Sequence, residues 1–292
     1  MTDYFGYNDK VAVVTDSSSG MGKAATNMLV DLGAKVYVLD WADCDVEGIT
    51  GFMHTDLSQK ESIDTAFEKL PDHIDNFFGI VGVSGIKTDF NKTTIIDFIA
   101  NQYICEEHLI HRMTNGSAIA FITSMGGWNR EREGNKKYIL PLINAKGWEE
   151  KIKALEALNM DSLPGALGYT YAKMAMNYYT AYLQQIFASQ GIRVNSLLPG
   201  STNSGMIDEF TEAAGGMDSF LTYTGHAHRL ATPEEMGEPV VFLNSDMARY
   251  ISGELLVVDY DCGIEKTAGI TKDHMRMDEF TFDLLLQSIN KE

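Results

Sequence analysis

The chain has 292 residues, of which 45% are hydrophobic and 22% charged, an ordinary globular composition that suffices for one large α/β domain or two small ones. Its net charge of −18 is spread along the whole chain. Such a surface repels a phosphate backbone, so we expect no nucleic-acid partner. The longest apolar runs, such as 118–122 and 255–258, are too short to cross a bilayer, and the first ten residues lack a basic-then-apolar secretion signal.

The three cysteines, Cys44, Cys105 and Cys262, are scattered without a CxxC pair or a metal-ligand spacing. We therefore expect no metal site. Isolated thiols of this kind are typical of proteins from a reducing compartment, so we expect a cytoplasmic protein that contacts no membrane.

Short apolar segments alternate with longer amphipathic ones along the chain. Segments that are apolar on both faces and alternate with helices indicate a parallel sheet covered on both sides. We predict an α/β fold with a single doubly wound (Rossmann-like) parallel sheet, in one domain that spans residues 1–292. Strands are expected at 11–14, 35–39, 51–54, 76–83, 118–122, 193–198 and 254–258, and helices at 22–32, 62–70, 93–113, 147–158 and 165–187.

Three segments interrupt this alternation. An insertion at 126–167 precedes the last long helix and includes a charged, glycine-containing stretch at 129–137. A second segment, 201–228, is rich in Met, Phe and Gly and reads either as a mobile lid over a hydrophobic substrate or as an ordinary surface helix. A C-terminal extension follows at 264–292. Its apolar residues predict another helix: Met277, Phe280, Phe282, Leu284, Leu285, Leu286 and Ile289.

Tyr169 and Lys173 lie four residues apart in the predicted helix 165–187. At this spacing the two side chains share one helix face. The ammonium favours phenolate, so we expect it to lower the pKa of Tyr169 toward the range of a general acid or base. Tyr171 lies about 200° around the helix and is expected in the core or in a subunit contact. The pair alone is weak evidence, because such spacings also arise by chance.

The first predicted strand runs into a glycine-containing turn, 15–22, and then a helix. Glycines at such a turn let backbone N–H groups and the helix N-terminus approach a pyrophosphate. The alternative is a turn that needs glycine only for its backbone angles. The second strand ends at Asp40, whose carboxylate could accept both ribose hydroxyls of an adenosine and would repel a 2′-phosphate. A solvated aspartate at a strand end is the alternative there.

Taken in order, these features resemble the short-chain dehydrogenase/reductase family over nearly the whole chain. Thr15, Gly20 and Gly22 match its Thr-Gly-x-x-x-Gly-x-Gly motif, with Asp16 at the first glycine. The segment 82–85 replaces its Asn-Asn-Ala-Gly. Three further features match the family in order: an Asp-Leu pair after the third strand (Asp56, Leu57), a catalytic tetrad (Asn101, Ser124, Tyr169, Lys173) and a segment after the sixth strand (193–200, with Ser204 where threonine is common).

The resemblance implies specific catalytic roles. Tyr169 would be the general acid/base, and Ser124 would hydrogen-bond the reacting oxygen. Lys173 would hold the nicotinamide ribose and, with the positive nicotinamide ring, depress the pKa of Tyr169. Asn101 would anchor a water molecule in a proton relay.

The resemblance also implies NAD(H) as the cofactor. Asp16 and Asp40 together argue for NAD over NADP, because both carry negative charge near the expected adenosine. Aspartate tolerates the unusual angles of a tight turn better than most residues. Gly82 in place of asparagine is expected to remove a contact that braces the sheet. The expected cofactor-binding residues are Ser19, Gly20, Met21, Asp40, Trp41, Asp56, Leu57, Gly82, Tyr169, Lys173, Pro199, Gly200 and Thr202.

Within the family, the long stretch before Tyr169 resembles the bacterial 3α-hydroxysteroid dehydrogenase/carbonyl reductase group. This implies a bulky hydrophobic alcohol or ketone as substrate, with a hydroxysteroid or bile acid as the leading class and a non-steroidal ketone as the alternative. A non-catalytic NAD(H)-sensing regulatory protein is the alternative from another class. Family members form dimers and tetramers through the helices that correspond to 93–113 and 169–187, so we expect a homodimer or homotetramer.

Overall fold

The computed structural model describes residues 3–270 and 280–289. These residues form a seven-stranded sheet in which every pair of neighbours is parallel, in the order β3-β2-β1-β4-β5-β6-β7. This confirms the predicted doubly wound sheet. The strands are β1 (Val11–Thr15), β2 (Lys35–Asp40), β3 (Gly51–His54), β4 (Asn76–Gly79), β5 (Ala118–Ile122), β6 (Arg193–Pro199) and β7 (Leu255–Val258).

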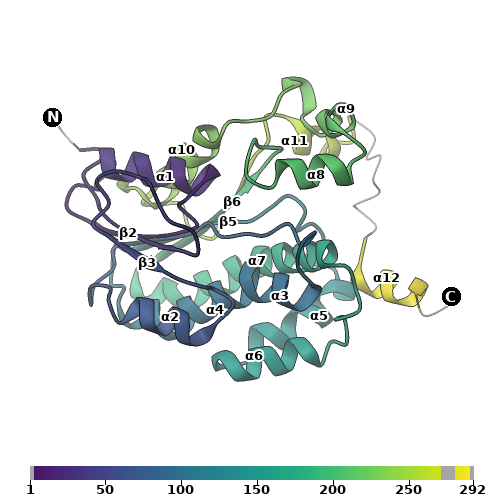
Figure 1. The fold of residues 1–292 in the computed structure, drawn as a ribbon, viewed down its shortest axis with the longest axis horizontal. Coiled ribbons are helices and arrows are strands. Elements are labelled where there is room, and N and C mark those ends of the chain that lie inside the picture. The colour runs from purple at the N-terminus through teal and green to yellow at the C-terminus, as the bar shows by residue number, and fades with distance from the viewer. Residues whose placement is uncertain (1–2, 271–279, 290–292) are drawn as a thin grey trace.

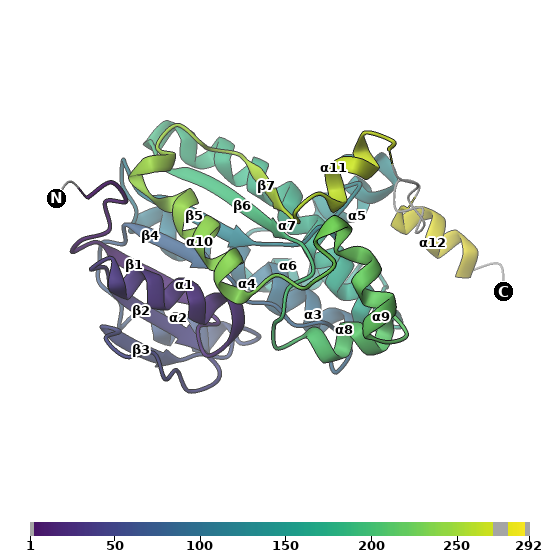
Figure 2. The same ribbon diagram turned by 90° about the horizontal axis from the view of Figure 1, so that it is seen from above.

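Helices cover both faces of this sheet (Figures 1 and 2). The sheet side chains alternate between the two layers, because successive residues of a strand point to opposite faces. Val13 of β1 lies in one buried cluster with α2, α4 and α7, whereas Ala12 and Val14 lie in the other with α1 and α10. The helices of the two layers are α1 (Gly20–Asp31) and α10 (Pro233–Asn244) on one face, and α2 (Lys60–Phe67), α3 (Phe90–Thr94), α4 (Ala100–Tyr103) and α7 (Gly165–Phe187) on the other.

The predicted helix 93–113 is not continuous. Two π-helical turns, Ile95–Ile99 and Ile104–His108, flank α4, and a 3-10 turn closes the segment at Leu109–His111. Each π-helical turn changes which side chains face the sheet, and such turns are frequent at functional sites. Spacing along the sequence does not reveal them.

The predicted strand 76–83 is also too long, because β4 ends at Gly79. Beyond it, the N–H groups of Ile80 and Val81 donate to the side-chain hydroxyl of Thr15 at 2.9 and 3.2 Å instead of to a backbone carbonyl of the neighbouring strand β1. The apolar residues after Gly79 therefore form a loop at the carboxyl edge of the sheet.

The insertion contains two helices, α5 (Glu133–Asn144) and α6 (Gly147–Glu156), of which only the second was predicted. The predicted C-terminal helix is present as α12 (Phe282–Ile289), whereas Met277 lies outside the described residues. Figure 2 shows α12 at the end of the molecule near α5. Shorter helices follow β6 and β7, namely α8 (Ile207–Ala213), α9 (Met217–Phe220) and α11 (Cys262–Thr267).

The insertion and α12 pack on the helix layer that contains α7. Tyr171 is fully buried there, and its hydroxyl donates to the carbonyl of Tyr138 at 2.7 Å. Its ring lies 5.5 Å from that of Phe282, and Trp148 of α6 packs edge-on against Tyr103 at 5.4 Å. Tyr171 is thus a core residue. Much of the helix surface expected at a subunit contact is covered by the chain's own insertion, so an oligomer would need other surfaces.

Among the residues that the structure describes, no helix combines the length and the apolar character needed to cross a membrane.

Candidate active site

A cavity of about 660 Å³ lies at the carboxyl edge of the sheet. Its walls come from the segments that follow β1, β4, β5, β6 and β7, from α7, and from the segment 201–228. The order of strands reverses between β1 and β4, and such a reversal opens a crevice at the carboxyl ends of the strands. The topology therefore determines where the site lies.

The turn between β1 and α1 forms one wall of this cavity, with Ser19, Gly20 and Met21 among its lining residues. Gly20 has φ +53, and a Cβ on Gly22 would lie 1.7 Å from the carbonyl oxygen of Asp16, so the turn can close only with glycine there. Helix α1 begins at this wall with no side-chain cap and no acidic residue in its first turn. An N-terminus of this kind fits the pyrophosphate of a dinucleotide.

Two carboxylates accompany this turn. Asp40 is almost buried and accepts the N–H groups of Ser18 at 2.8 Å and Ala42 at 2.9 Å. Asp16 has φ +58, a left-handed conformation that aspartate adopts more readily than most residues. Burial raises the pKa of Asp16 to about 7, and the negative charge of Asp40 adds to the shift. The negative charge expected at Asp16 is therefore partly neutralised near pH 7.

Ser124, Tyr169 and Lys173 all line the cavity. Tyr169 and Lys173 share one face of α7, with the Lys173 Nζ 5.5 Å from the Tyr169 ring centre. Ser124 follows β5, where its hydroxyl accepts the N–H of Gly126 at 2.9 Å and hydrogen-bonds with Tyr169. The structure thus brings together three of the four expected catalytic side chains around one space.

The expected fall in the pKa of Tyr169 is wrong for this structure. Burial raises the pKa of Tyr169, and this effect outweighs the lowering by the Lys173 ammonium and by the hydrogen bond with Ser124. The negative charge of Asp97 raises it further. Helical spacing reveals the neighbouring lysine, but it does not reveal how far the phenol is removed from water.

Lys173 is almost fully buried. Its Nζ lies 3.7 Å from Oδ2 of Asp97 and 3.5 Å from the carbonyl oxygen of Val81. Asp97 is 1% exposed, and its Oδ1 accepts the N–H of Val83 at 2.8 Å. Burial raises the pKa of Asp97 to about 6. Asp97 was not predicted as a site residue, although it is an isolated aspartate in the apolar run 95–100.

Asn101 is buried beside the sheet rather than in the cavity wall. A Cβ on Gly79 would lie 2.6 Å from its side-chain oxygen, so this asparagine packs closely over β4. That oxygen has no hydrogen-bond partner among the described residues. A buried acceptor without a partner fits a bound water molecule, which is the role expected for Asn101.

The other expected cofactor residues divide into two groups. Gly82, Pro199, Gly200 and Thr202 line the cavity. The remaining three lie outside the cavity wall: Trp41 is 69% exposed, Leu57 is buried in the core, and Asp56 accepts the N–H of Ser58 at 2.8 Å.

The segment 201–228 forms an apolar wall opposite the tyrosine. The Phe210 ring of α8 lies edge-on to Tyr169 with 5.6 Å between ring centres. The preceding Glu209 hydrogen-bonds Ser84 and pairs with Lys87 at 2.6 Å, which ties α8 to the loop after β4. Met206, Phe210, Phe220 and Tyr223 of this segment line the cavity, whereas Met217 is 44% exposed.

The insertion contributes little to the cavity. Only Gly126 and Trp128 of the segment 126–167 line it, while α5 and α6 pack on the helix layer beside α7. Trp128, Met125 and Cys262 also line the cavity and were not predicted from the sequence. Loop residues of this kind carry no periodic signal that points to a cavity.

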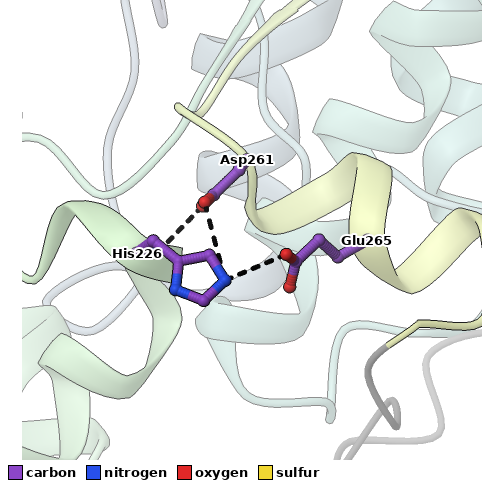
Figure 3. A group of neighbouring side chains, drawn as sticks. All are labelled: His226, Asp261 and Glu265. Carbon is purple, nitrogen blue, oxygen red and sulfur yellow. Dashed lines mark hydrogen bonds and ion pairs between the residues drawn. The ribbon is translucent and has the colours of Figure 1, made fainter.

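His226, Asp261 and Glu265 form a small polar cluster where the segment 201–228 meets α11 (Figure 3). The His226 ring lies 2.9 Å from Glu265, and its backbone N–H donates to Asp261 at 2.9 Å. Their side chains offer ligand atoms within 4.8 Å of one another, which is close enough for a divalent ion. These three residues already interact with one another at the surface. Their contacts connect the segment 225–227 to α11, which accounts for the cluster without an ion.

Comparison with known proteins agrees with this geometry. A family profile described as "Enoyl-(Acyl carrier protein) reductase" matches residues 137–263. A 3α-hydroxysteroid dehydrogenase of Mediterraneibacter gnavus is 27% identical over 265 residues, which cover 86% of this chain and 96% of that protein. A cyclohexanol dehydrogenase of an Acinetobacter species is 26% identical over 266 residues, covering 87% and 94%.

The fold matches solved structures as well. The crystal structure of a 3α-hydroxysteroid dehydrogenase from a Pseudomonas species, complexed with NADH, has a TM-score of 0.68 at 20% identity and covers 90% of this chain and 100% of that one. The ordered motifs, the sheet topology and these matches agree with one another. The chain is similar to the short-chain dehydrogenase/reductase family, and within that family it resembles the 3α-hydroxysteroid dehydrogenases.

Proposed function

We propose that this protein is an NAD(H)-dependent oxidoreductase that interconverts a secondary alcohol and a ketone on a bulky hydrophobic substrate. A hydroxysteroid or bile acid is the leading substrate class. The observation that carries the proposal is the joint placement of Ser124, Tyr169 and Lys173 on the wall of the cavity that also contains the β1–α1 turn. A phenol hydrogen-bonded to a serine and close to an ammonium is suited to proton exchange with an alcohol oxygen.

In the proposed mechanism the chain's own residues handle the proton. Bound NAD(H) supplies or accepts the hydride at the carbinol carbon. During oxidation Tyr169 takes the proton of the alcohol, and during reduction it donates that proton to the ketone oxygen. Ser124 orients the reacting oxygen through its hydroxyl. Lys173 holds the ribose hydroxyls of the cofactor, and Asn101 anchors a water molecule that links the lysine to solvent.

The proposed cofactor site extends from the β1–α1 turn to the catalytic residues. The carboxylate of Asp40 keeps lone pairs free for ribose hydroxyls beyond the two N–H groups it accepts. A 2′-phosphate there would meet this carboxylate, so the site favours NAD(H) over NADP(H). The remaining proposed cofactor residues are Ser19, Gly20, Met21, Trp41, Asp56, Leu57, Gly82, Pro199, Gly200 and Thr202.

The apolar wall supports a hydrophobic substrate. Trp128, Phe210 and Phe220 line the cavity, and Phe210 contacts the ring of Tyr169, so a bound substrate would meet aromatic surface next to the proton donor. The names of two relatives, a 3α-hydroxysteroid dehydrogenase and a cyclohexanol dehydrogenase, describe secondary alcohols on saturated six-membered rings. A cyclic non-steroidal ketone is therefore the alternative substrate.

We further propose that residues 1–292 act as one catalytic domain. Within it, 201–228 serves as the substrate lid, 126–167 as an insertion that braces the α7 layer, and 264–292 as a C-terminal extension. A homodimer or homotetramer remains the proposed assembly, built on surfaces that the insertion leaves open.

The decisive variant is Tyr169→Phe, matched with Tyr171→Phe two residues along the same helix. Without the Tyr169 hydroxyl, turnover should fall by about 100-fold or more, while NADH affinity stays close to that of the wild type. Tyr171→Phe removes a hydroxyl that bonds only within the core, so it should cost about 1 kcal/mol of stability and leave turnover intact. Steady-state kinetics measures the turnover of both variants, and NADH fluorescence titration measures their affinity for NADH. Retained activity in Tyr169→Phe would refute the assignment.

Cofactor choice has its own test in the wild-type protein. The affinity for NADH should exceed that for NADPH, and Asp40→Ala should narrow the gap because it removes the charge opposite the 2′-phosphate. A preference for NADPH would contradict the role given to Asp40. Binding of NADH without turnover of any member of a broad alcohol and ketone panel would instead favour a non-catalytic NAD(H) sensor.

A further inference from the structure

Asp97 lies behind the cavity wall next to Lys173 but has no place in the proposed mechanism. It lies in a π-helical turn, Ile95–Ile99, and is 1% exposed. Of its two carboxylate oxygens, Oδ1 accepts the backbone N–H of Val83 at 2.8 Å, and Oδ2 lies 3.7 Å from the Lys173 Nζ. Burying a carboxylate costs free energy unless hydrogen bonds or an opposite charge compensate for the lost hydration, so the position of Asp97 needs an explanation.

Two contacts connect Asp97 to opposite parts of the site. Through Val83 it holds the loop after β4, where Gly82 lines the cavity. Through Oδ2 it faces the ammonium of Lys173, which a Cβ on Gly82 would approach to 3.0 Å. Loop and lysine are therefore packed against each other with Asp97 behind both.

The bonding of Asp97 is incomplete in a way that structural carboxylates rarely show. Its Oδ2 is buried and has no hydrogen-bond partner among the described residues, because 3.7 Å is an ion-pair distance and too long for a hydrogen bond. The Lys173 ammonium is likewise loosely held, with the Val81 carbonyl at 3.5 Å as its other neighbour. The lysine therefore keeps N–H donors available for another group, and Asp97 acts on it through its charge rather than through a hydrogen bond.

We propose that Asp97 is a positioning residue for the reaction, which keeps Lys173 and the loop 82–85 in one arrangement and opposes the charge of Lys173 beside Tyr169. This inference rests on the proposed function. The charged groups around the site are Lys173 and Asp97 themselves, Asp16 after β1 with Asp40 beside it, and Asp259 after β7, which lines the cavity. The charge of Asp97 opposes that of Lys173 at the phenol of Tyr169.

The test is Asp97→Asn, which keeps the shape of the side chain and an oxygen for the Val83 N–H but removes the charge. With the Lys173 charge unopposed, the acidic limb of kcat/KM for alcohol oxidation should move to lower pH by about half a unit or more. The KM for NAD⁺ should rise several-fold, because the lysine loses the carboxylate that holds it. An acidic limb that stays in place or moves to higher pH would overturn the proposal.

Asp75→Asn is the matched control. Asp75 also accepts a backbone N–H, that of Val11 at 2.9 Å, and pairs with Lys10 at 2.9 Å, but it immediately precedes β4 at the opposite edge of the sheet. This variant should lower stability and leave the pH profile in place. An equal shift of the profile in both variants would show a general effect of charge removal and would also overturn the proposal.

A reciprocal measurement needs no turnover. In Lys173→Met, Asp97 would carry an uncompensated charge, so its pKa should rise further. Between pH 6 and 8 the folded variant would then bind more protons than the folded wild type, and its stability should fall more steeply as pH increases. The free energy of unfolding is measured with urea at several pH values in this range. If it changes with pH equally in the two proteins, the coupling of Asp97 to Lys173 is refuted. An Asp97→Asn profile that fails to shift in an otherwise active enzyme would overturn this inference alone, whereas an inactive wild type would refute the proposed function.

Discussion

Two buried lysine–carboxylate pairs in the described part of the chain differ in how well they are bonded. In the insertion, Lys151 is fully buried, lies 3.0 Å from Glu106 and donates to the Ala145 carbonyl at 2.7 Å. Glu106 also accepts bonds from Gln102 and Tyr179. At the cavity, Lys173 and Asp97 are 3.7 Å apart, and one carboxylate oxygen has no hydrogen-bond partner among the described residues.

The difference separates a structural pair from a functional one. Burying two charges stabilises a fold only when further hydrogen bonds satisfy them, as they do around Lys151. The pair at the cavity lacks those bonds and leaves the lysine able to bind another group. Incomplete satisfaction of buried polar groups is common where a ligand completes the bonding.

The largest expected effect comes from removing each lysine in turn. Lys173→Met should reduce turnover by about 100-fold or more, because the proposed site loses the group that holds the cofactor ribose. Lys151→Met should leave turnover of the folded enzyme unchanged but destabilise it by about 3–5 kcal/mol, because Glu106 remains buried without its partner. Turnover and urea unfolding measured on both variants check this. Equal losses of activity in the two variants would abolish the distinction between the pairs.

A smaller effect is expected from Asp16, the other carboxylate near the cavity lysine. Its pKa is raised from 3.8 to about 7, so the folded protein binds more protons than the unfolded chain between these values. Its contribution to stability is therefore lost as pH rises through about 7. Asp16→Asn, which keeps a residue suited to φ +58, should stabilise the protein by on the order of 1–3 kcal/mol above pH 7 and hardly at all near pH 4.

Unfolding of both proteins across this pH range tests the prediction. A constant difference between wild type and Asp16→Asn at every pH would show that the effect comes from backbone conformation rather than from buried charge.

The smallest effect concerns the lid. Glu209 ties α8 to Ser84 and Lys87, but Lys87 is largely exposed, so the ion pair contributes little free energy. Glu209→Gln should raise the KM for a bulky substrate about two- to fivefold with little change in kcat, whereas Glu212→Gln on the same helix should not. Identical KM values for the two variants would show that this contact does not control the lid.

Features that repeat along the chain could be predicted from the sequence. Alternation of apolar and amphipathic segments predicted the parallel sheet, and the spacing of Tyr169 and Lys173 predicted a shared helix face, which the structure confirms. Tyr171 was correctly separated from the site for the same reason.

Features that depend on tertiary packing could not be predicted in this way. The π-helical turn that carries Asp97 has no sequence period of its own, and the rise in the pKa of Tyr169 comes from burial by distant segments. Helix α5 was missed because Gly134 and its charged neighbours resemble a loop, whereas contacts with α12 stabilise the helix: Asn135 accepts the N–H of Phe282 at 2.8 Å.

The most direct test of the central claim is to mix the purified wild-type protein with NADH and a panel of cyclic ketones that includes a 3-oxosteroid, and to follow NADH absorbance. The account predicts that NADH is oxidised in proportion to the alcohol formed and that replacement by NADPH slows the reaction. An unchanged NADH absorbance with every ketone, under conditions where NADH is bound, would contradict it.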